Sequence, residues 1–268
     1  RNRDGAVLQY SLDNGQVWNN VGKIDDGIKW YNSFEILNGP GGQGVGWTGE
    51  KIFNPDDNWN EARHRLDILR GYENVRLRIA YGSDGNSREK NEGFAFDDIW
   101  IGERDKMVLI EHFTNATDTE AVNADQLINN IQKDFTRDGV DLKYHTAFPG
   151  TDSINLLNPA DPGARVLFYG ISNIPYTVIN GGVNDQRYNY SENQPSGMDI
   201  NLLSLKDPGF SLDVNLENND GNLGIDVDAT ALNSYGDHEI SLYVVIVEKL
   251  INKYKREYAN SVRDMLPN

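Results

Sequence analysis

Apolar and polar positions alternate along much of the first hundred residues. From 75 to 81 every second residue is apolar, which is the pattern of a strand with one buried face. Near the start, the runs 6–12 and 16–19 flank Asp13-Asn14-Gly15, a sequence that tolerates positive φ. The pattern therefore predicts antiparallel strands that are joined by tight turns.

Residues 108–145 follow a different pattern. Val108–Thr114 is a short apolar run of the kind that forms a strand buried on both faces. Apolar residues then recur at helical spacing from 124 to 135, and Gly139 is placed to stop that helix. Residues 140–145 return as a second strand. The predicted order is strand, helix, strand, with a right-handed crossover.

Two further segments extend this α/β region. Asp161-Pro162 is typical of an N-cap followed by proline in the first helical turn, and it predicts a short helix that reaches Tyr169. Pro175 begins an apolar strand, and the Asn-Gly-Gly sequence at 180–182 ends that strand with a hairpin-type turn.

The last seventy residues return to alternation. Residues 184–194 are polar and predict a loop. The runs 212–216 and 223–227 alternate and are joined by Asn218–Gly221, which predicts two antiparallel strands, and 240–251 predicts a further apolar strand. The charged residues 103–106 form a short linker between the first two regions.

Composition narrows the range of functions. The chain has 268 residues and a formal net charge of −16, from 41 acidic and 25 basic residues, so nucleic acid is a poor partner. No apolar run approaches the roughly 18 residues of a membrane-spanning helix. No signal peptide is visible, because residues 1–4 lead straight into a predicted strand, so we expect the sequence to start inside a longer precursor of a secreted protein.

Five segments of the α/β region carry a family resemblance: Val108–Asn115, Tyr144–Thr146, Phe148–Gly150, Ala164-Arg165 with Tyr169–Ile171, and Ile174–Gly181. They resemble the thioredoxin-fold outer-membrane and secreted proteins of Bacteroidota. That resemblance implies a structural cis peptide bond at Ile174–Pro175. Members of the family often carry Cys-x-x-Cys after the segment that matches 113–115, but this chain contains no cysteine. Thiol–disulfide exchange, which needs two thiols, is therefore excluded for this chain.

The first region resembles a second kind of module. The matching segments are Asp4–Ser11 with Asp13–Gly15, Gly46–Gly49, Ala62-Arg63 with Leu66-Asp67, Arg78–Asp84 and Phe94–Ile99. They resemble the MAM-like jelly-roll modules of secreted Bacteroidota proteins. At the other end, 245–248 and 262–267 match the β-sandwich that often follows the thioredoxin unit in the first family.

Together these patterns predict a multidomain, mainly β protein with one α/β domain. We expect a jelly-roll β-sandwich at 1–103 that lacks its first strands, and a thioredoxin-like domain without cysteines at 107–198. An Ig-like antiparallel β-sandwich at 199–268 that lacks its last strands would follow. Isolated sheets avoid exposed edges, so we expect both ends of the sequence to be completed by flanking chain or by a partner.

Two groups of residues in the first region are candidate ligand sites. Asp97 and Asp98 are adjacent carboxylates that could bind calcium with Asp84, or they could cap loop amides instead. Three tryptophans could form an aromatic platform for sugars, or they could be core residues. These tryptophans are Trp47, Trp59 and Trp100.

The α/β region offers little sign of catalysis. His112 and His145 fall on neighbouring predicted strands, where each could lie near a carboxylate or be a satisfied structural residue. The four histidines have no zinc-ligand spacing, and neither a Gly-x-Ser-x-Gly elbow nor a phosphate-binding loop is present. Paired carboxylates permit glycosidase chemistry but do not indicate it.

The resemblances therefore imply a non-catalytic protein of the outer cell surface. It would be exported by type IX secretion and serve adhesion, surface assembly or protein interaction. Its partners would be other cell-surface or secretion-system proteins, or flanking parts of its own precursor. One alternative is a glycan-binding, calcium-dependent module of a larger secreted enzyme. Another is an accessory part of an enzyme whose catalytic domain lies elsewhere.

Overall fold

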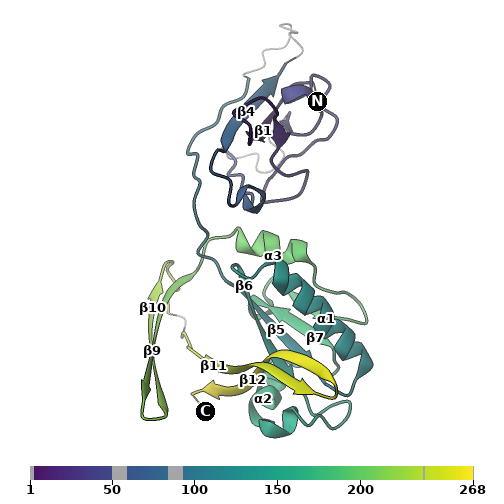
Figure 1. The fold of residues 1–268 in the computed structure, drawn as a ribbon, viewed down its shortest axis with the longest axis vertical. Helices are drawn as coiled ribbons and strands as arrows, with labels where there is room; N and C mark the ends of the chain where they lie inside the picture. Colours follow the sequence, from purple (N-terminus) through teal and green to yellow (C-terminus); the bar gives the residue numbers. More distant parts are fainter. Residues whose placement is uncertain (1–2, 50–58, 84–92, 238, 268) are drawn as a thin grey trace. The chain divides into compact units, whose positions relative to one another are not determined.

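The computed structural model describes residues 3–49, 59–83, 93–237 and 239–267. Among the described residues, 34% lie in strands and 19% in helices, and the chain divides into two compact units, 1–104 and 105–268 (Figure 1). The mainly β class is therefore confirmed. The jelly-roll, thioredoxin-like and Ig-like assignments stay predictions.

The first unit contains a small sheet built around one strand. This strand, β1, pairs with β4 along its whole length, from Gly5↔Gly82 to Ser11↔Arg76, and its other edge pairs with β2 and then β3. The strands are β1 Gly5–Ser11, β2 Asn19–Asn20, β3 Trp47–Thr48 and β4 Arg76–Gly82. Two 3-10 turns, Pro40–Gly42 and Asp67–Leu69, lie in the connecting loops.

The core of the first unit consists of Val7, Val21, Trp30 and Tyr31. Both aromatic residues bury their rings while their polar atoms reach a backbone carbonyl. The Trp30 indole N–H donates to Val21 O at 2.9 Å, and the Tyr31 hydroxyl donates to Leu8 O at 3.0 Å. These bonds remove the cost of burying a polar group.

The first predicted hairpin forms with a wider turn than the sequence suggested. Asn14 and Gly15 have the expected positive φ, of 62° and 94°. However, the Asp13 carboxylate accepts hydrogen bonds from the amides of residues 16 and 17, at 3.0 and 2.9 Å. Because the side chain satisfies these amides, residues 16–18 do not pair with β1, and β2 begins only at Asn19.

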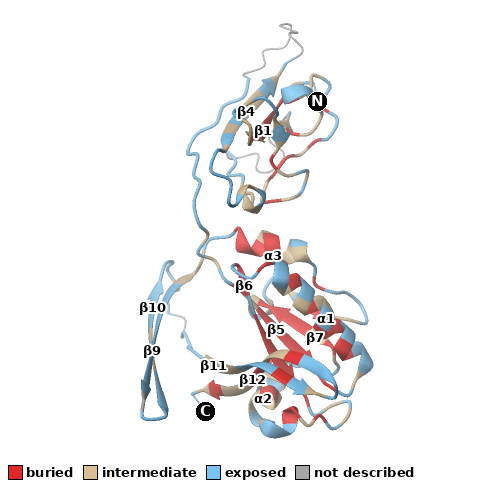
Figure 2. Ribbon diagram, viewed as in Figure 1, coloured by how far each residue is buried: buried red, intermediate tan, exposed pale blue. Residues whose placement is uncertain are grey.

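The second unit contains a six-stranded sheet in the order β11-β12-β6-β5-β7-β8. Strand β6 is parallel to both β5 and β12, and the remaining pairs are antiparallel. The strands are β5 Val108–Thr114, β6 Gly139–His145, β7 Tyr176–Ile179, β8 Arg187–Asn189, β11 Val244–Lys253 and β12 Arg256–Leu266. Figure 2 shows that the buried residues concentrate in the central strands of this sheet.

Helices cover both faces of this sheet. The helices are α1 Thr119–Asp134, α2 Ala160–Tyr169 and α3 Gly197–Ser204. Residues of α1 and α3 pack on one face with Val108 and Ile110, whereas Tyr169 of α2 packs on the other face with Phe113 and Tyr144. The central strand β5 is thus buried on both sides, as its apolar sequence predicts.

Two helix starts differ from the prediction. Helix α2 begins at Ala160 rather than after Asp161, because the Asn158 side chain accepts a hydrogen bond from the Asp161 amide, at 3.3 Å. Helix α3 was not predicted as a helix at all. It begins with a capping box, in which Ser196 and Asp199 each accept a hydrogen bond from the other's backbone amide.

Strands β9 (Phe210–Asn219) and β10 (Asn222–Ala231) form a separate two-stranded sheet, which confirms the predicted hairpin. Asp220 and Gly221 make its turn with positive φ. Strands β11 and β12 instead extend the sheet of the preceding region, where Val262 joins the apolar cluster of Phe113. Residues 199–268 therefore contribute to two different sheets.

The packing of α1 on the sheet predicts a large penalty for Ile128→Ala, because Ile128 is fully buried. We expect the free energy of unfolding of the second unit to fall by about 2–5 kcal/mol, measured by urea denaturation with circular dichroism. Leu167→Ala on α2 is the matched control, since Leu167 is 82% exposed and should cost less than about 0.5 kcal/mol. Equal losses in both variants would contradict the assigned core.

Candidate functional site

The predicted calcium ligands do not form a described cluster. Asp97 and Asp98 are both exposed, and the Asp97 carboxylate accepts a hydrogen bond from the Asp98 amide at 2.8 Å. Asp84 lies outside the described residues. Within the described ranges, no group of three or more acidic, histidine or cysteine residues is placed to hold a metal ion.

The three candidate tryptophans differ in environment. The Trp47 ring packs edge-on against Trp30 and Tyr31, at 4.9 and 4.7 Å between ring centroids, and its N–H donates to Lys29 O. Trp59 and Trp100 are 58% and 70% exposed. Across the described residues these three rings make no contact with one another.

The second unit buries two histidines, each beside a carboxylate and a hydroxyl. His112 is fully buried on β5, and its Nδ1 lies 2.8 Å from Thr177 Oγ1 on β7, just after the cis peptide bond Ile174–Pro175. Its Nε2 lies 3.2 Å from Asp125 Oδ1 on α1. Thr177 also contacts the Tyr190 hydroxyl at 3.0 Å. Carboxylate, imidazole and hydroxyl thus lie in a row.

His145 stands at the end of β6 in a similar arrangement. Its Nδ1 lies 2.7 Å from Asp152 Oδ2, and its Nε2 lies 3.2 Å from Ser261 Oγ on β12. This is the order of groups in a serine–histidine–aspartate relay. However, Ser261 is fully buried, and the Tyr258 ring lies edge-on over His145 at 5.7 Å. No substrate can reach this hydroxyl in the described conformation.

Asp152 is held in its ionised form. Burial alone would raise the pKa of its carboxyl group, but the hydrogen bond with His145 and those from the amides of Ala116 and Ile154 outweigh burial. The pKa of Asp152 therefore lies below its ordinary value of 3.8. Because the amide of Ala116 belongs to the loop before α1, this carboxylate ties that loop to β6 and β12.

A third buried network lies on the opposite face of the sheet. The Arg165 guanidinium donates to Glu111 Oε1 from Nε and from Nη2, at 2.9 and 2.6 Å, and the Tyr169 hydroxyl donates to the same carboxylate. Burial lowers the pKa of Arg165, but the Glu111 charge outweighs it and raises that pKa overall. Burial, with Glu111 adding to it, also raises the pKa of Tyr169 and Tyr144.

Sequence reasoning placed the histidines correctly but not their partners. Glu111 does not contact His112, since neighbouring residues of a strand point to opposite faces. The carboxylates are Asp125 and Asp152, which come from the following helix and loop. Asp125 could have been found as a polar residue on the apolar face of the predicted helix. No local signal pointed to Ser261, because its position depends on the pairing of β12 with β6.

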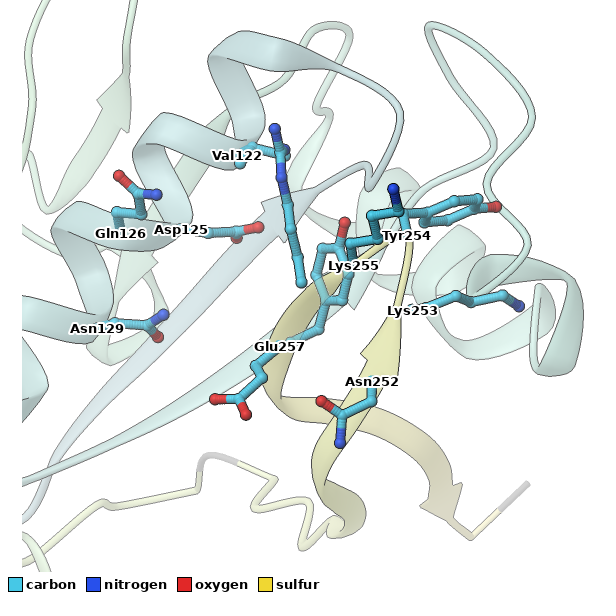
Figure 3. A pocket seen from close by; sticks show the side chains of 11 residues that line it. Val122, Asp125, Gln126, Asn129, Asn252, Lys253, Tyr254, Lys255 and Glu257 are labelled. Atoms are coloured by element: carbon cyan, nitrogen blue, oxygen red, sulfur yellow. The ribbon is translucent and has the colours of Figure 1, made fainter.

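Next to these networks lies an open groove of about 680 Å³ between α1 and the turn that joins β11 to β12. Figure 3 shows side chains of α1 on one side and those of the β11–β12 turn on the other. Tyr258 forms part of the groove and separates it from His145. The groove is lined by Val122, Asp125, Gln126, Asn129 and the residues from Asn252 to Tyr258.

Comparisons with known proteins give no assignment. Neither a protein-family model, nor a curated protein, nor a solved structure matches this chain. Among the described residues, no helix is long and apolar enough to cross a membrane.

The lowered pKa of Asp152 predicts a pH-dependent loss of stability. A carboxylate whose folded pKa is depressed stabilises the fold above its unfolded pKa, and that contribution disappears as the pH falls through the folded pKa. We expect Asp152→Asn to cost about 1–3 kcal/mol at neutral pH and progressively less below about pH 4, measured by urea denaturation. Asp185→Asn, at an exposed position, is the control. A difference between wild type and Asp152→Asn that did not change with pH would contradict the interpretation.

Proposed function

We propose that this chain is a non-catalytic binding protein of the secreted or cell-surface class, serving adhesion, surface assembly or protein interaction. Its partners would be other surface or secretion-system proteins, or flanking parts of a longer precursor. The proposal concerns mainly the second unit, where both the buried polar networks and the groove lie.

The proposed fold of the second unit is thioredoxin-like, without the thiols. The strand order β6-β5-β7-β8 supports it, with α1 between the parallel strands β5 and β6, and α2 before the antiparallel strand β7. Strands β12 and β11 extend this sheet beyond β6. A jelly roll in the first unit, an Ig-like sandwich at the end of the chain and export by type IX secretion rest on the sequence resemblances to Bacteroidota proteins.

The observation that carries the binding role is the burial of the two hydroxyls beside the histidines. Ser261 and Thr177 are both 0% exposed. A nucleophile must reach its substrate, and a general base must face the proton that it takes. The hydrogen bonds that Thr177 and Ser261 form with the two histidines instead satisfy polar groups that would be costly to bury. The neighbouring groove, by contrast, is open and lined by side chains that can bind a ligand.

A calcium-dependent glycan-binding module remains the second candidate, with Asp97 and Asp98 or the exposed Trp59 and Trp100 as its residues. Retention on a polysaccharide column that needs millimolar calcium would favour it. Protease treatment of intact cells that removes the protein would favour the surface location.

The row of Ser261, His145 and Asp152 allows the sharpest test of the non-catalytic role. We expect a fluorophosphonate probe, which labels activated serines, to leave the native protein unlabelled. Ser261→Ala should cost about 1 kcal/mol of stability, because it removes the partner of His145 Nε2. A known serine hydrolase controls for probe quality. Labelling of the native protein that Ser261→Ala abolishes would overturn the proposal and assign a hydrolytic site.

A further inference from the structure

The groove differs in charge from the rest of the protein. The whole chain carries a net charge of −16. The groove lining, however, contains three cationic residues, Lys253, Lys255 and Arg256, together with Tyr254. Its acidic residues are Asp125 and Glu257. The Asp125 side chain is nine-tenths buried and lies 3.2 Å from His112 Nε2, and among the described residues it forms no ion pair with a cation of the turn.

Two of these cations have no counter-charge. Lys255 and Arg256 are exposed, and neither side chain forms an ion pair or a hydrogen bond with any residue that the structure describes. The Lys253 ammonium donates to the Ser153 carbonyl at 3.4 Å and lies 5.9 Å from the centre of the Tyr254 ring. A hydrogen bond between a cation and an anionic oxygen is about twice as strong as a neutral one. The turn therefore offers unsatisfied donors for an anion.

The remaining lining is suited to hydroxyl groups. Gln126, Asn129 and Asn252 place three carboxamides around the groove, and a carboxamide can both donate and accept hydrogen bonds. The Asn129 oxygen already accepts one from the Lys143 ammonium, which leaves its amino group for a ligand. Tyr254 is 50% exposed, and its ring offers a flat apolar face. Val122 is the one aliphatic side chain in the described lining. The lining therefore provides no apolar pocket for the anchor residues of a peptide.

We infer that this groove binds an acidic oligosaccharide, one that carries carboxylate or sulfate groups on a hydroxyl-rich chain. Lys255 and Arg256 contact the acidic groups, the carboxamides contact the hydroxyls, and Tyr254 stacks on a sugar ring. This inference rests on the proposed binding role and names its ligand class. It assigns the ligand to residues of the second unit and not to the tryptophans and aspartates of the first.

The test is isothermal titration calorimetry of the full chain with four probes. The probes are an oligogalacturonate, a sulfated heparin fragment, a neutral cello-oligosaccharide and poly-glutamate. We expect at least one acidic oligosaccharide to bind, more weakly as salt rises, and the neutral one not to bind. The double variant Lys255→Ala, Arg256→Ala should weaken binding about tenfold or more. Circular dichroism checks that each variant is folded.

Two further variants separate a built site from general charge attraction. Lys133→Ala with Lys249→Ala removes the same charge from exposed positions outside the groove lining and should change affinity less than about twofold. Gln126→Ala with Asn252→Ala leaves the charge unchanged and should still weaken binding to the sugar. Equal loss in the Lys133 and Lys249 variant, or no loss in the Gln126 and Asn252 variant, would overturn the inference.

The remaining outcomes are also decisive. Poly-glutamate that bound as tightly as the sugars would replace the sugar with an acidic peptide as ligand. If no acidic probe binds, the inference about the ligand is overturned, but the non-catalytic role is not. That role depends on the separate result with the fluorophosphonate probe.

Discussion

The burial of strand β5 on both faces is the constraint on which the second unit depends. Alternate residues of this strand point to opposite layers, so that His112 lies under α1 while Glu111 lies under α2. Neither group can be buried without partners, because an unpaired polar group in the interior is costly. Thr177 forms a hydrogen bond with His112 Nδ1, and Asp125 lies 3.2 Å from His112 Nε2. Arg165 and Tyr169 donate hydrogen bonds to Glu111. The helices are therefore held to the sheet by specific polar contacts as well as by apolar packing.

The same requirement explains how the end of the chain joins the sheet. Strand β12 pairs with β6 at Ser261↔Lys143, and Ser261 meets His145 while Asn260 donates to Asp141 at 2.6 Å. Tyr258 then covers His145 from the groove side. The buried row of Ser261, His145 and Asp152 therefore satisfies three polar groups at the point where β12, the loop after β6 and the start of α1 meet. Order of groups alone does not make a catalytic site, since access is also needed.

Local patterns in the sequence predicted the elements better than their assembly. The apolar run of β5, the helical spacing of α1 and the Asp220-Gly221 turn are all signals within a few residues, and all three elements form. Helix α1 ends at Asp134, before the predicted stop at Gly139, which is the first residue of β6. Helix α3 was missed because its capping box and short apolar run lay beside a segment that was interpreted as loop and strand. The place of β12 depends on contacts with residues more than a hundred positions earlier, which no local period encodes.

The groove follows from this long-range assembly. Its α1 side is formed by Val122, Asp125, Gln126 and Asn129, and its other side by the turn between β11 and β12, and no local pattern in the sequence placed the two together. Once β12 lies beside β6, the turn before it must project next to α1. Cations that would be unremarkable on an isolated hairpin then face carboxamides across an open space. The position of the proposed ligand site is thus a consequence of the contacts that fix β12, which include the buried hydrogen bond of Ser261 with His145 and the partly buried one from Asn260 to Asp141.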